Sequence, residues 1–271
     1  MHDHLRLKAS SAILTRAKQL GASLAGFASV ADLKTAPSFT FAPKMPNAND
    51  YLEAWGNDLG LEPGKTAWPE HAKTILVMGV AHPEDKPEMD WWLGLKNPLG
   101  NRILIDLAKT LCVWIEERFG IKTVHLPYRV EKGGTYLKDA AVLAGLGCIG
   151  KNNLLVTPQL GPRIRLRALA LDVVLPPTGP GNFDPCALCE QFCRNACPQN
   201  AFGNQIYAPE AYGQAALPGR DGSFFRTTCQ LQMDIDEIPL SAPVGGTDAD
   251  LPTIKYCRHC ELACPVGKEG K

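Results

Sequence analysis

The residues of this chain best suited to chemistry are its cysteines, and most of them lie near its end. Of 10 cysteines in 271 residues, eight follow residue 185. Residues 186–198 read CALCEQFCRNACP, residue 229 is a single cysteine, and residues 257–265 read CRHCELACP. Thiols clustered at such short spacings are typical metal ligands, whereas the disulfides of secreted proteins are more scattered. The sequence therefore predicts metal binding in this region.

The spacing of these cysteines indicates the kind of metal centre. Bacterial ferredoxins use C-x2-C-x2-C-x3-C-P, in which the fourth cysteine binds the other cluster of a pair. The first run fits this pattern with one additional residue between Cys189 and Cys193, and both runs end in C-x3-C-P. Eight thiolates suit two [4Fe–4S] clusters. The crossed pattern predicts one cluster on Cys186, Cys189, Cys193 and Cys264, and the other on Cys197, Cys229, Cys257 and Cys260.

Other interpretations of these cysteines are less consistent with the spacing. Structural zinc also uses CxxC pairs, but matched C-x3-C-P endings are not typical of it. A redox disulfide requires one CxxC rather than two sets of four thiols. Cys112 stands apart on the face of an expected helix, where we expect it to be a small buried hydrophobic residue.

A glycine-rich run precedes the cysteine region. Residues 145–150, GLGCIG, match the dinucleotide motif G-x-G-x-x-G, which requires a strand before it and a helix after it. Here TYLKDAAVLA before the run predicts a helix, and NNLLVTP after it predicts extended chain. Arginines 163, 165 and 167 lie where an acidic ribose ligand is expected. We therefore do not expect NAD or FAD to bind here.

The elements that must position these groups can be read from hydrophobic periodicity. Residues 9–21 and 101–119 have the apolar spacing of amphipathic helices, and residues 74–81 and 163–175 are typical of strands. The segment PPTGPGNFDP at 176–185 predicts a linker or rigid loop. We therefore expect an α/β domain at 1–180 and a second domain at 181–271, whose sparse apolar pattern would require metal crosslinks.

The charge distribution restricts the expected partners. The formal net charge is zero, which argues against general nucleic-acid binding. Residues 181–271 carry 7 basic and 11 acidic side chains, whereas residues 121–170 carry 8 basic and 2 acidic ones. The basic stretch is either a solvated face or a site for an anionic ligand. With no apolar run of about 20 residues and no secretory signal at the N-terminus, we expect a cytoplasmic protein without membrane contact.

Taken together, these motifs resemble one known group of enzymes. The segment AGLGCIGKNNLLVTPQLGPRIRLRALALD, followed by the cysteine-rich tail, is similar to epoxyqueuosine reductases and the related reductive dehalogenases. The resemblance implies an α+β chain, with a nitroreductase-like front domain that holds a corrinoid and a ferredoxin-like domain with two [4Fe–4S] clusters. It implies an oxidoreductase whose cofactors are these clusters and cobalamin.

The resemblance also implies roles for individual residues. Glu131 falls at the position of the family's proton-donating Asp, and the alternative for Glu131 is a surface ion pair with a neighbouring Lys. Epoxyqueuosine reductases usually carry Trp where Cys148 stands. The glycines would allow close approach of the macrocycle, and Arg163 would hold its carboxamides or phosphate. The candidate cofactor-binding residues are Gly145, Gly147, Cys148, Gly150, Lys151, Asn152, Asn153, Leu154, Gly161, Pro162 and Arg163.

Three functions are compatible with these patterns. The first is a corrinoid-dependent reductase of a small-molecule substrate, supplied with electrons by an external donor of the ferredoxin or flavodoxin type. The second is an electron-transfer module, or a reductive activator of a partner corrinoid protein, without a substrate of its own. The third is a flavin reductase on the same nitroreductase-like scaffold.

Overall fold

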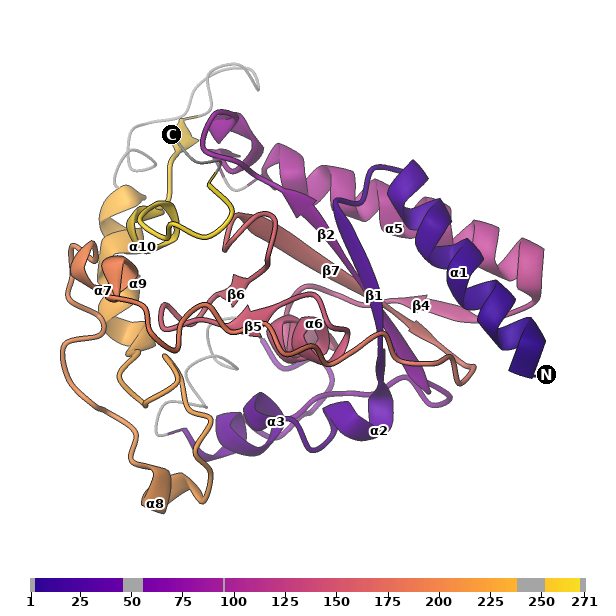
Figure 1. The fold of residues 1–271 in the computed structure, drawn as a ribbon, viewed down its shortest axis with the longest axis horizontal. Coiled ribbons are helices and arrows are strands. Elements are labelled where there is room, and N and C mark those ends of the chain that lie inside the picture. Colours follow the sequence, from indigo (N-terminus) through magenta and orange to yellow (C-terminus); the bar gives the residue numbers. More distant parts are fainter. Residues whose placement is uncertain (1–2, 46–55, 95, 238–251, 269–271) are drawn as a thin grey trace.

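The computed structural model describes residues 3–45, 56–94, 96–237 and 252–268 (Figure 1). Its centre is an antiparallel sheet with the strand order β1-β2-β7-β4. Seven of the eight residues of β2 are buried, which explains its continuous apolar sequence. The strand predicted at 74–81 is confirmed with the same bounds. The strands are β1 (Leu24–Ser29), β2 (Thr74–Ala81), β4 (Thr123–His125) and β7 (Ile164–Leu171).

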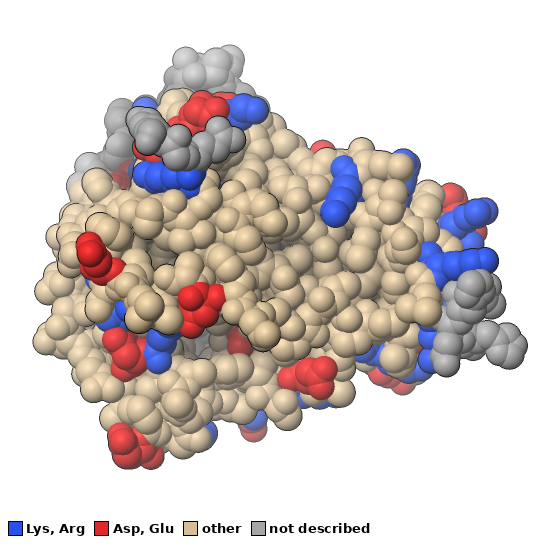
Figure 2. All heavy atoms as spheres, viewed as in Figure 1, with Lys and Arg blue, Asp and Glu red and all other residues tan. Residues whose placement is uncertain are grey.

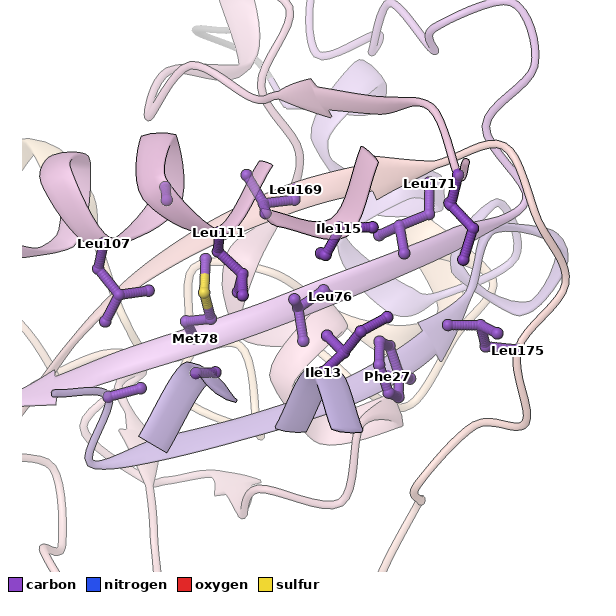
Figure 3. Close-up of a cluster of buried hydrophobic side chains, with 14 of the residues drawn as sticks. Ile13, Phe27, Leu76, Met78, Leu107, Leu111, Ile115, Leu169, Leu171 and Leu175 are labelled. Atoms are coloured by element: carbon purple, nitrogen blue, oxygen red, sulfur yellow. The ribbon is translucent and has the colours of Figure 1, made fainter. Parts of the chain in front are cut away.

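Two long helices, α1 (Asp3–Gln19) and α5 (Leu99–Phe119), cover one face of this sheet (Figures 1 and 3). Their apolar stripes, with Ile13 and Leu111 fully buried, pack against side chains of β1, β2 and β7. Helix α5 ends at Gly120, whose φ of 64° is a conformation that glycine adopts without strain. Helix α1 begins earlier than the predicted residue 9, because its first turns lack the apolar spacing on which that prediction depended.

The opposite face of the sheet is covered by α2 (Val30–Leu33) and α6 (Leu137–Leu143). A hairpin of β5 (Cys148–Ile149) and β6 (Leu155–Val156) follows α6. The predicted order of helix, glycine run and extended chain is therefore confirmed. Shorter elements of this part are α3 (Pro37–Phe41), η1 (Ala42–Lys44), η2 (Pro87–Met89) and η3 (Val130–Lys132).

The Pro/Gly-rich segment at 176–185 is a rigid loop attached to the sheet. The Thr178 hydroxyl accepts a hydrogen bond from the Phe27 amide at 2.9 Å and donates one to the Ala144 carbonyl at 2.6 Å. Beyond this loop the described elements are short, and the longest of them is α9. They are α7 (Phe192–Asn195), α8 (Pro209–Tyr212), α9 (Arg226–Asp236), β8 (Thr253–Ile254) and α10 (His259–Leu262).

This tail folds back against the α/β part. Strand β8 pairs with β3 (Trp92–Leu93) in a separate two-stranded sheet, and α7 and α10 lie close together (Figure 1). The mixed helix and strand content agrees with the expected α+β class. No helix among the described residues has the length and apolar character needed to cross a bilayer.

Candidate functional site

The eight clustered cysteines form two groups in space. Four of them line a small cavity between the β5–β6 turn and the tail, and the other four line the wall of a much larger cavity. The first group is Cys186, Cys189, Cys193 and Cys264. The second group is Cys197, Cys229, Cys257 and Cys260. The crossed assignment predicted from the C-x3-C-P endings would place one cluster on each of these groups.

Electrostatic interactions between the thiols mainly follow the same grouping, although Cys193 of the first group also raises the pKa of Cys260 of the second. Burial raises the pKa of the Cys193 thiol to about 11, with further contributions from Cys264, Cys186 and Cys189. Burial likewise raises the pKa of Cys260, and neighbouring Cys229 and Cys257 raise it further. Thiols that repel one another when ionised require a cation to hold them as thiolates together.

The second group also has a backbone environment suited to sulfur ligands. The Ala201 amide donates a hydrogen bond to Cys197 Sγ at 3.3 Å. Amide hydrogen bonds of this kind stabilise iron–sulfur thiolates. In the described ranges, no group of three or more His, Cys, Asp or Glu side chains is arranged to hold a single metal ion.

A ninth cysteine, Cys148, lies between the two cavities. It is buried, it contacts the Cys186 thiol through a sulfur–sulfur hydrogen bond, and it lines the larger cavity. That hydrogen bond lowers the pKa of Cys186 to about 6 and raises that of Cys148. The tenth, Cys112, is partly buried against the core beneath α5, as expected of a small hydrophobic residue.

The larger cavity lies between the α/β part and the tail and has a volume of about 1400 Å³. Pockets for small ligands usually have volumes of roughly 300–1,000 Å³, so this one has room for a large cofactor together with a substrate. Its wall combines residues of η3 and α6, the β5–β6 hairpin, the start of β7, α9 and α10. Five of the eleven predicted cofactor-binding residues line it: Cys148, Asn152, Asn153, Leu154 and Pro162.

The predicted glycines serve close packing within the protein rather than the cavity wall. A Cβ on Gly147 would lie 2.1 Å from the Val156 carbonyl oxygen, and one on Gly161 would lie 2.0 Å from that of Val266. Gly145, with a φ of 72°, packs against the backbone at Thr178, and Gly150 packs against Val156. None of these glycines is among the residues lining the large cavity, so the wall gives no support to their predicted contact with a macrocycle.

Arg163 and Lys151 also contact the tail rather than the large cavity. The Arg163 guanidinium is buried and donates to the carbonyls of Val266 at 2.5 Å and Cys264 at 3.3 Å. Lys151 donates to the Cys189 carbonyl at 3.2 Å and lines the small cavity. Both residues therefore stabilise the loops that carry the first thiol group.

Glu131, the candidate proton donor, lines the large cavity from η3. The neighbouring Lys132, its alternative partner in a surface ion pair, forms an ion pair with Asp58. Lys138 lines the same cavity from α6 and donates to the Asn153 carbonyl at 2.6 Å. Burial lowers the pKa of Lys138 to about 8, although nearby Asp139 raises it and Arg226 lowers it further.

A buried network of charges joins the two parts of the chain at one end of the cavity. Arg165 pairs with Asp90, and Arg258 of the tail pairs with Glu261 and donates to the His82 carbonyl. His82 Nδ1 lies 3.7 Å from a carboxylate oxygen of both Asp90 and Glu261. Burial, together with Arg258 and Arg165, lowers the pKa of His82 to about 3, so the imidazole is neutral.

The wall of the large cavity also offers hydrogen-bonding groups that fit an amide-rich cofactor such as a corrinoid. Thr135 and Asp139 are both 2% exposed, and each has one buried side-chain oxygen with no hydrogen-bond partner among the described residues. Buried polar atoms are rarely left unpaired, so such atoms indicate a ligand or ordered water. Together with the volume of the cavity, they make a bound corrinoid physically reasonable.

Several site residues could not be found from sequence spacing. His82 and Asp90 lie far along the chain from Arg258 and Glu261, and none of the four belongs to a recognisable motif. Only the excess of basic residues at 121–170 pointed toward Lys138, and it could equally have indicated a solvated face.

No protein-family model matches the chain. Its sequence is 41% identical to the tetrachloroethene reductive dehalogenase of Desulfitobacterium hafniense over 68 residues, which cover 24% of this chain and 12% of that protein. It is 27% identical to the epoxyqueuosine reductase of Lactococcus garvieae over 208 residues, or 73% of this chain and 53% of that protein.

Solved structures show the same fold. An epoxyqueuosine reductase in complex with a tRNA-Tyr stem loop has a TM-score of 0.62 at 18% identity, covering 97% of this chain and 66% of that one. A reductive dehalogenase whose structure suggests a mechanism for B12-dependent dehalogenation has a TM-score of 0.52 at 17% identity, covering 95% and 32%. The present chain thus spans only part of each of these proteins. It is nevertheless related to the epoxyqueuosine reductases and reductive dehalogenases, and it shares the fold of their solved members.

Proposed function

We propose that this protein is a reductase in which two [4Fe–4S] clusters deliver electrons to a corrinoid of the cobalamin type bound in the large cavity. The observation that carries the proposal is the position of the second thiol group, which lines the same cavity as Glu131 and Lys138. The relatives support it, because they are named as reductases and one of the similar structures is described as a B12-dependent dehalogenase. In this proposal the front part is nitroreductase-like and the tail ferredoxin-like, with the boundary near residue 180.

Different residues of the chain would bind the clusters, bind the cofactor and donate the proton. The first thiol group would hold the cluster nearer the surface, and the second group would hold the cluster beside the cavity. Thr135 and Asp139 would donate to or accept from the cofactor's amides. Bound there, a reduced corrinoid supplies a strong nucleophile and electron donor at its cobalt. Glu131 would donate a proton to the reduced substrate from its carboxyl group.

An external donor, which we propose to be a ferredoxin or flavodoxin, would reduce the first cluster. Leu188 lies between the ligands Cys186 and Cys189 and is 99% exposed, and nearby Phe192 is 44% exposed. We propose that these two exposed apolar side chains form part of the surface that the donor contacts. They lie beside the thiol group that is farther from the cavity, as an entry point for electrons requires.

We do not propose tRNA as the substrate. Figure 2 shows one face of the molecule on which charged side chains of both signs are scattered among uncharged residues. The net charge is zero, and phosphate contacts by Lys and Arg dominate affinity for nucleic acids. Tight and salt-sensitive binding of bulk tRNA in a titration at physiological salt would contradict this and favour a tRNA-modifying role.

The test of the proposed function is anaerobic reconstitution of the full chain with iron and sulfide, followed by addition of cobalamin. We expect about eight iron atoms per chain, a changed visible spectrum, and cobalamin that stays bound through gel filtration. Free elution of cobalamin, with rapid electron delivery to another protein, would favour the electron-transfer module or activator. Binding of zinc without iron would contradict the cluster assignment, and bound flavin would favour the flavin reductase.

A further inference from the structure

Arg220 has an unusual backbone conformation for an arginine. Its φ is 78°, in the left-handed region that favours glycine, and it follows Gly219, whose φ is 73°. The other described non-glycine residues with positive φ are two asparagines and one glutamine, and asparagine tolerates this region better than arginine does. Residues held there by the surrounding structure are frequent at functional sites. The side-chain contacts of Arg220 therefore indicate why an arginine stands where a glycine would be free of strain.

The Arg220 guanidinium contacts two segments that are distant in sequence. Nε donates to the Ile149 carbonyl of β5 at 2.9 Å. Nη1 lies 2.9 Å from Asp184 Oδ1, in the loop just before the first cysteine run. A glycine would supply neither contact. The arginine thus joins the β5–β6 hairpin to the loop that leads into Cys186.

The Asp184 carboxylate extends this contact to a proposed cluster ligand. Its Oδ1 accepts a hydrogen bond from the Cys186 amide at 3.1 Å. Cys186 belongs to the first thiol group, which lines the small cavity. Both charges of the Arg220–Asp184 pair therefore lie beside the cluster that we propose for this group.

Further hydrogen bonds fix the turn at residues 217–220. The Gly219 amide donates to Asn153 Oδ1 at 3.2 Å, and the Gly219 carbonyl accepts from Arg194 Nη2 at 2.6 Å. Asn153 belongs to the turn of the β5–β6 hairpin, and Arg194 belongs to the first cysteine run. The Arg220 side chain therefore extends from a backbone that is held against both segments.

A charge next to an iron–sulfur cluster changes the free energy of its reduction. Reduction adds one electron to an anionic cluster with four thiolate ligands, so a neighbouring cation favours it and a neighbouring anion opposes it. The side chains of Arg220 and Asp184 are 30% and 42% exposed, so solvent weakens both effects. In the native pair the two charges compensate each other. Removal of either one should therefore change the reduction potential, and the two changes should have opposite signs.

We propose that Arg220 is a positioning residue of the first cluster. Together with Asp184 it holds the Cys186 loop against β5, and the pair sets the reduction potential of the cluster that receives electrons from the donor. This inference rests on the proposed function, which supplies the cluster. Because Arg220 also lines the large cavity, its side chain lies between that cluster and the proposed cofactor site.

The test is a reductive titration of the full, iron-loaded chain with dithionite, followed by EPR, without added cobalamin. In Arg220→Gln the Asp184 carboxylate is uncompensated, so the equilibrium constant for reducing the first cluster should fall about fivefold. This equals about 40 mV, at about 59 mV per factor of ten for one electron. Asp184→Asn should raise the constant by a similar factor. The double variant, and Arg220→Lys with its charge retained, should lie close to the native value.

The second cluster is the internal control, and its signal is the one expected to be absent from Cys197→Ala. Its potential should be unchanged in the Arg220 and Asp184 variants. Arg118→Gln removes an exposed arginine at the end of α5, outside both cavities, and should change neither potential. If Arg220→Gln loses its iron, the expected increase in Asp184→Asn still tests the effect of the charge pair.

The outcomes separate this inference from the proposed function. Equal potentials in all variants, or changes of the same sign in both single variants, would overturn the role of Arg220 and leave the proposed function intact. A native chain that binds no iron–sulfur cluster would overturn both. Failure of cobalamin to bind would contradict the proposed function alone, because no arm of this test uses cobalamin.

Discussion

The α/β part and the tail are stabilised in different ways. The twelve largest fully buried side chains all lie before residue 176, in the two layers on either side of the sheet. Figure 3 shows one of these layers. In the tail, three of the few buried residues are the cysteines 186, 193 and 264. The first part can therefore fold by burying apolar surface, whereas the proposed function would have the second held by crosslinks through its thiols. The candidate site lies where these two kinds of structure meet.

The largest effect that tests this comparison is the removal of iron from the full chain. Anaerobic chelation should unfold most of the tail, because little apolar burial remains to order residues 181–268. Hydrogen–deuterium exchange should show at least a hundredfold loss of protection there, while β2 and β7 remain protected. A tail that keeps its protection without iron would mean that its own packing is sufficient.

The next effect concerns the ligand groups within the tail. Cys197→Ala should destroy the cluster of the second group, although residue 197 belongs to the first sequence run, because its thiol lines the large cavity with Cys229 and Cys260. EPR of the reduced protein should lose the signal of that cluster and retain the other. Cys112→Ala is the control and should retain both. Loss of the first group's signal instead would show that the assignment is not crossed.

In the α/β part, stability should depend on apolar volume instead. Leu111→Ala deletes a fully buried side chain in α5 and should reduce the free energy of unfolding of this part by about 3 kcal/mol. The matched control Val113→Ala changes a side chain on the same helix that is 56% exposed, and its effect should be below about 1 kcal/mol. Urea denaturation followed by circular dichroism measures both, with iron content unchanged. Equal effects would contradict a core held by burial.

The same contrast explains which parts of the fold could be predicted from sequence. Strand β2 was predicted with its correct bounds because burial on both faces leaves a continuous apolar run, and α5 because its stripe is long and ends at Gly120. In the tail, apolar periodicity was absent and only the cysteine spacing carried information. That spacing predicts two ligand sets, and the assignment of a cluster to each of them stays a prediction.

The residues around the cavity were harder to predict, because their roles depend on contacts between distant segments. Gly147 and Gly161 are required by carbonyls of residues 156 and 266, which no local motif reveals. The alternation of Arg163 and Arg165 was visible, but which of them reaches the tail and which the cavity depends on how the tail docks. Paired charges such as Asp90 and Arg258 are recognisable only after folding.

The smallest effect is the pH dependence of stability that comes from the buried charge network joining the two parts. The His82 imidazole faces Asp90 and Glu261 and lies near Arg163, Arg165 and Arg258. Its pKa in the folded protein is about 3, against 6.5 for an ordinary histidine. Between these values the unfolded chain binds a proton that the folded chain does not, so stability falls as the pH decreases.

From pH 7 to pH 5 this difference amounts to about 2 kcal/mol, or roughly 4–8 °C in melting temperature for a chain of this size. Because His82→Gln cannot take up the proton, its melting temperature should fall less over that interval than the melting temperature of the native protein. The control is His71→Gln, which removes an exposed histidine and should leave the pH dependence unchanged. If both variants follow the native curve, the neutral imidazole contributes nothing to the acid sensitivity. The contact between the two parts would then depend on the arginine–carboxylate pairs alone.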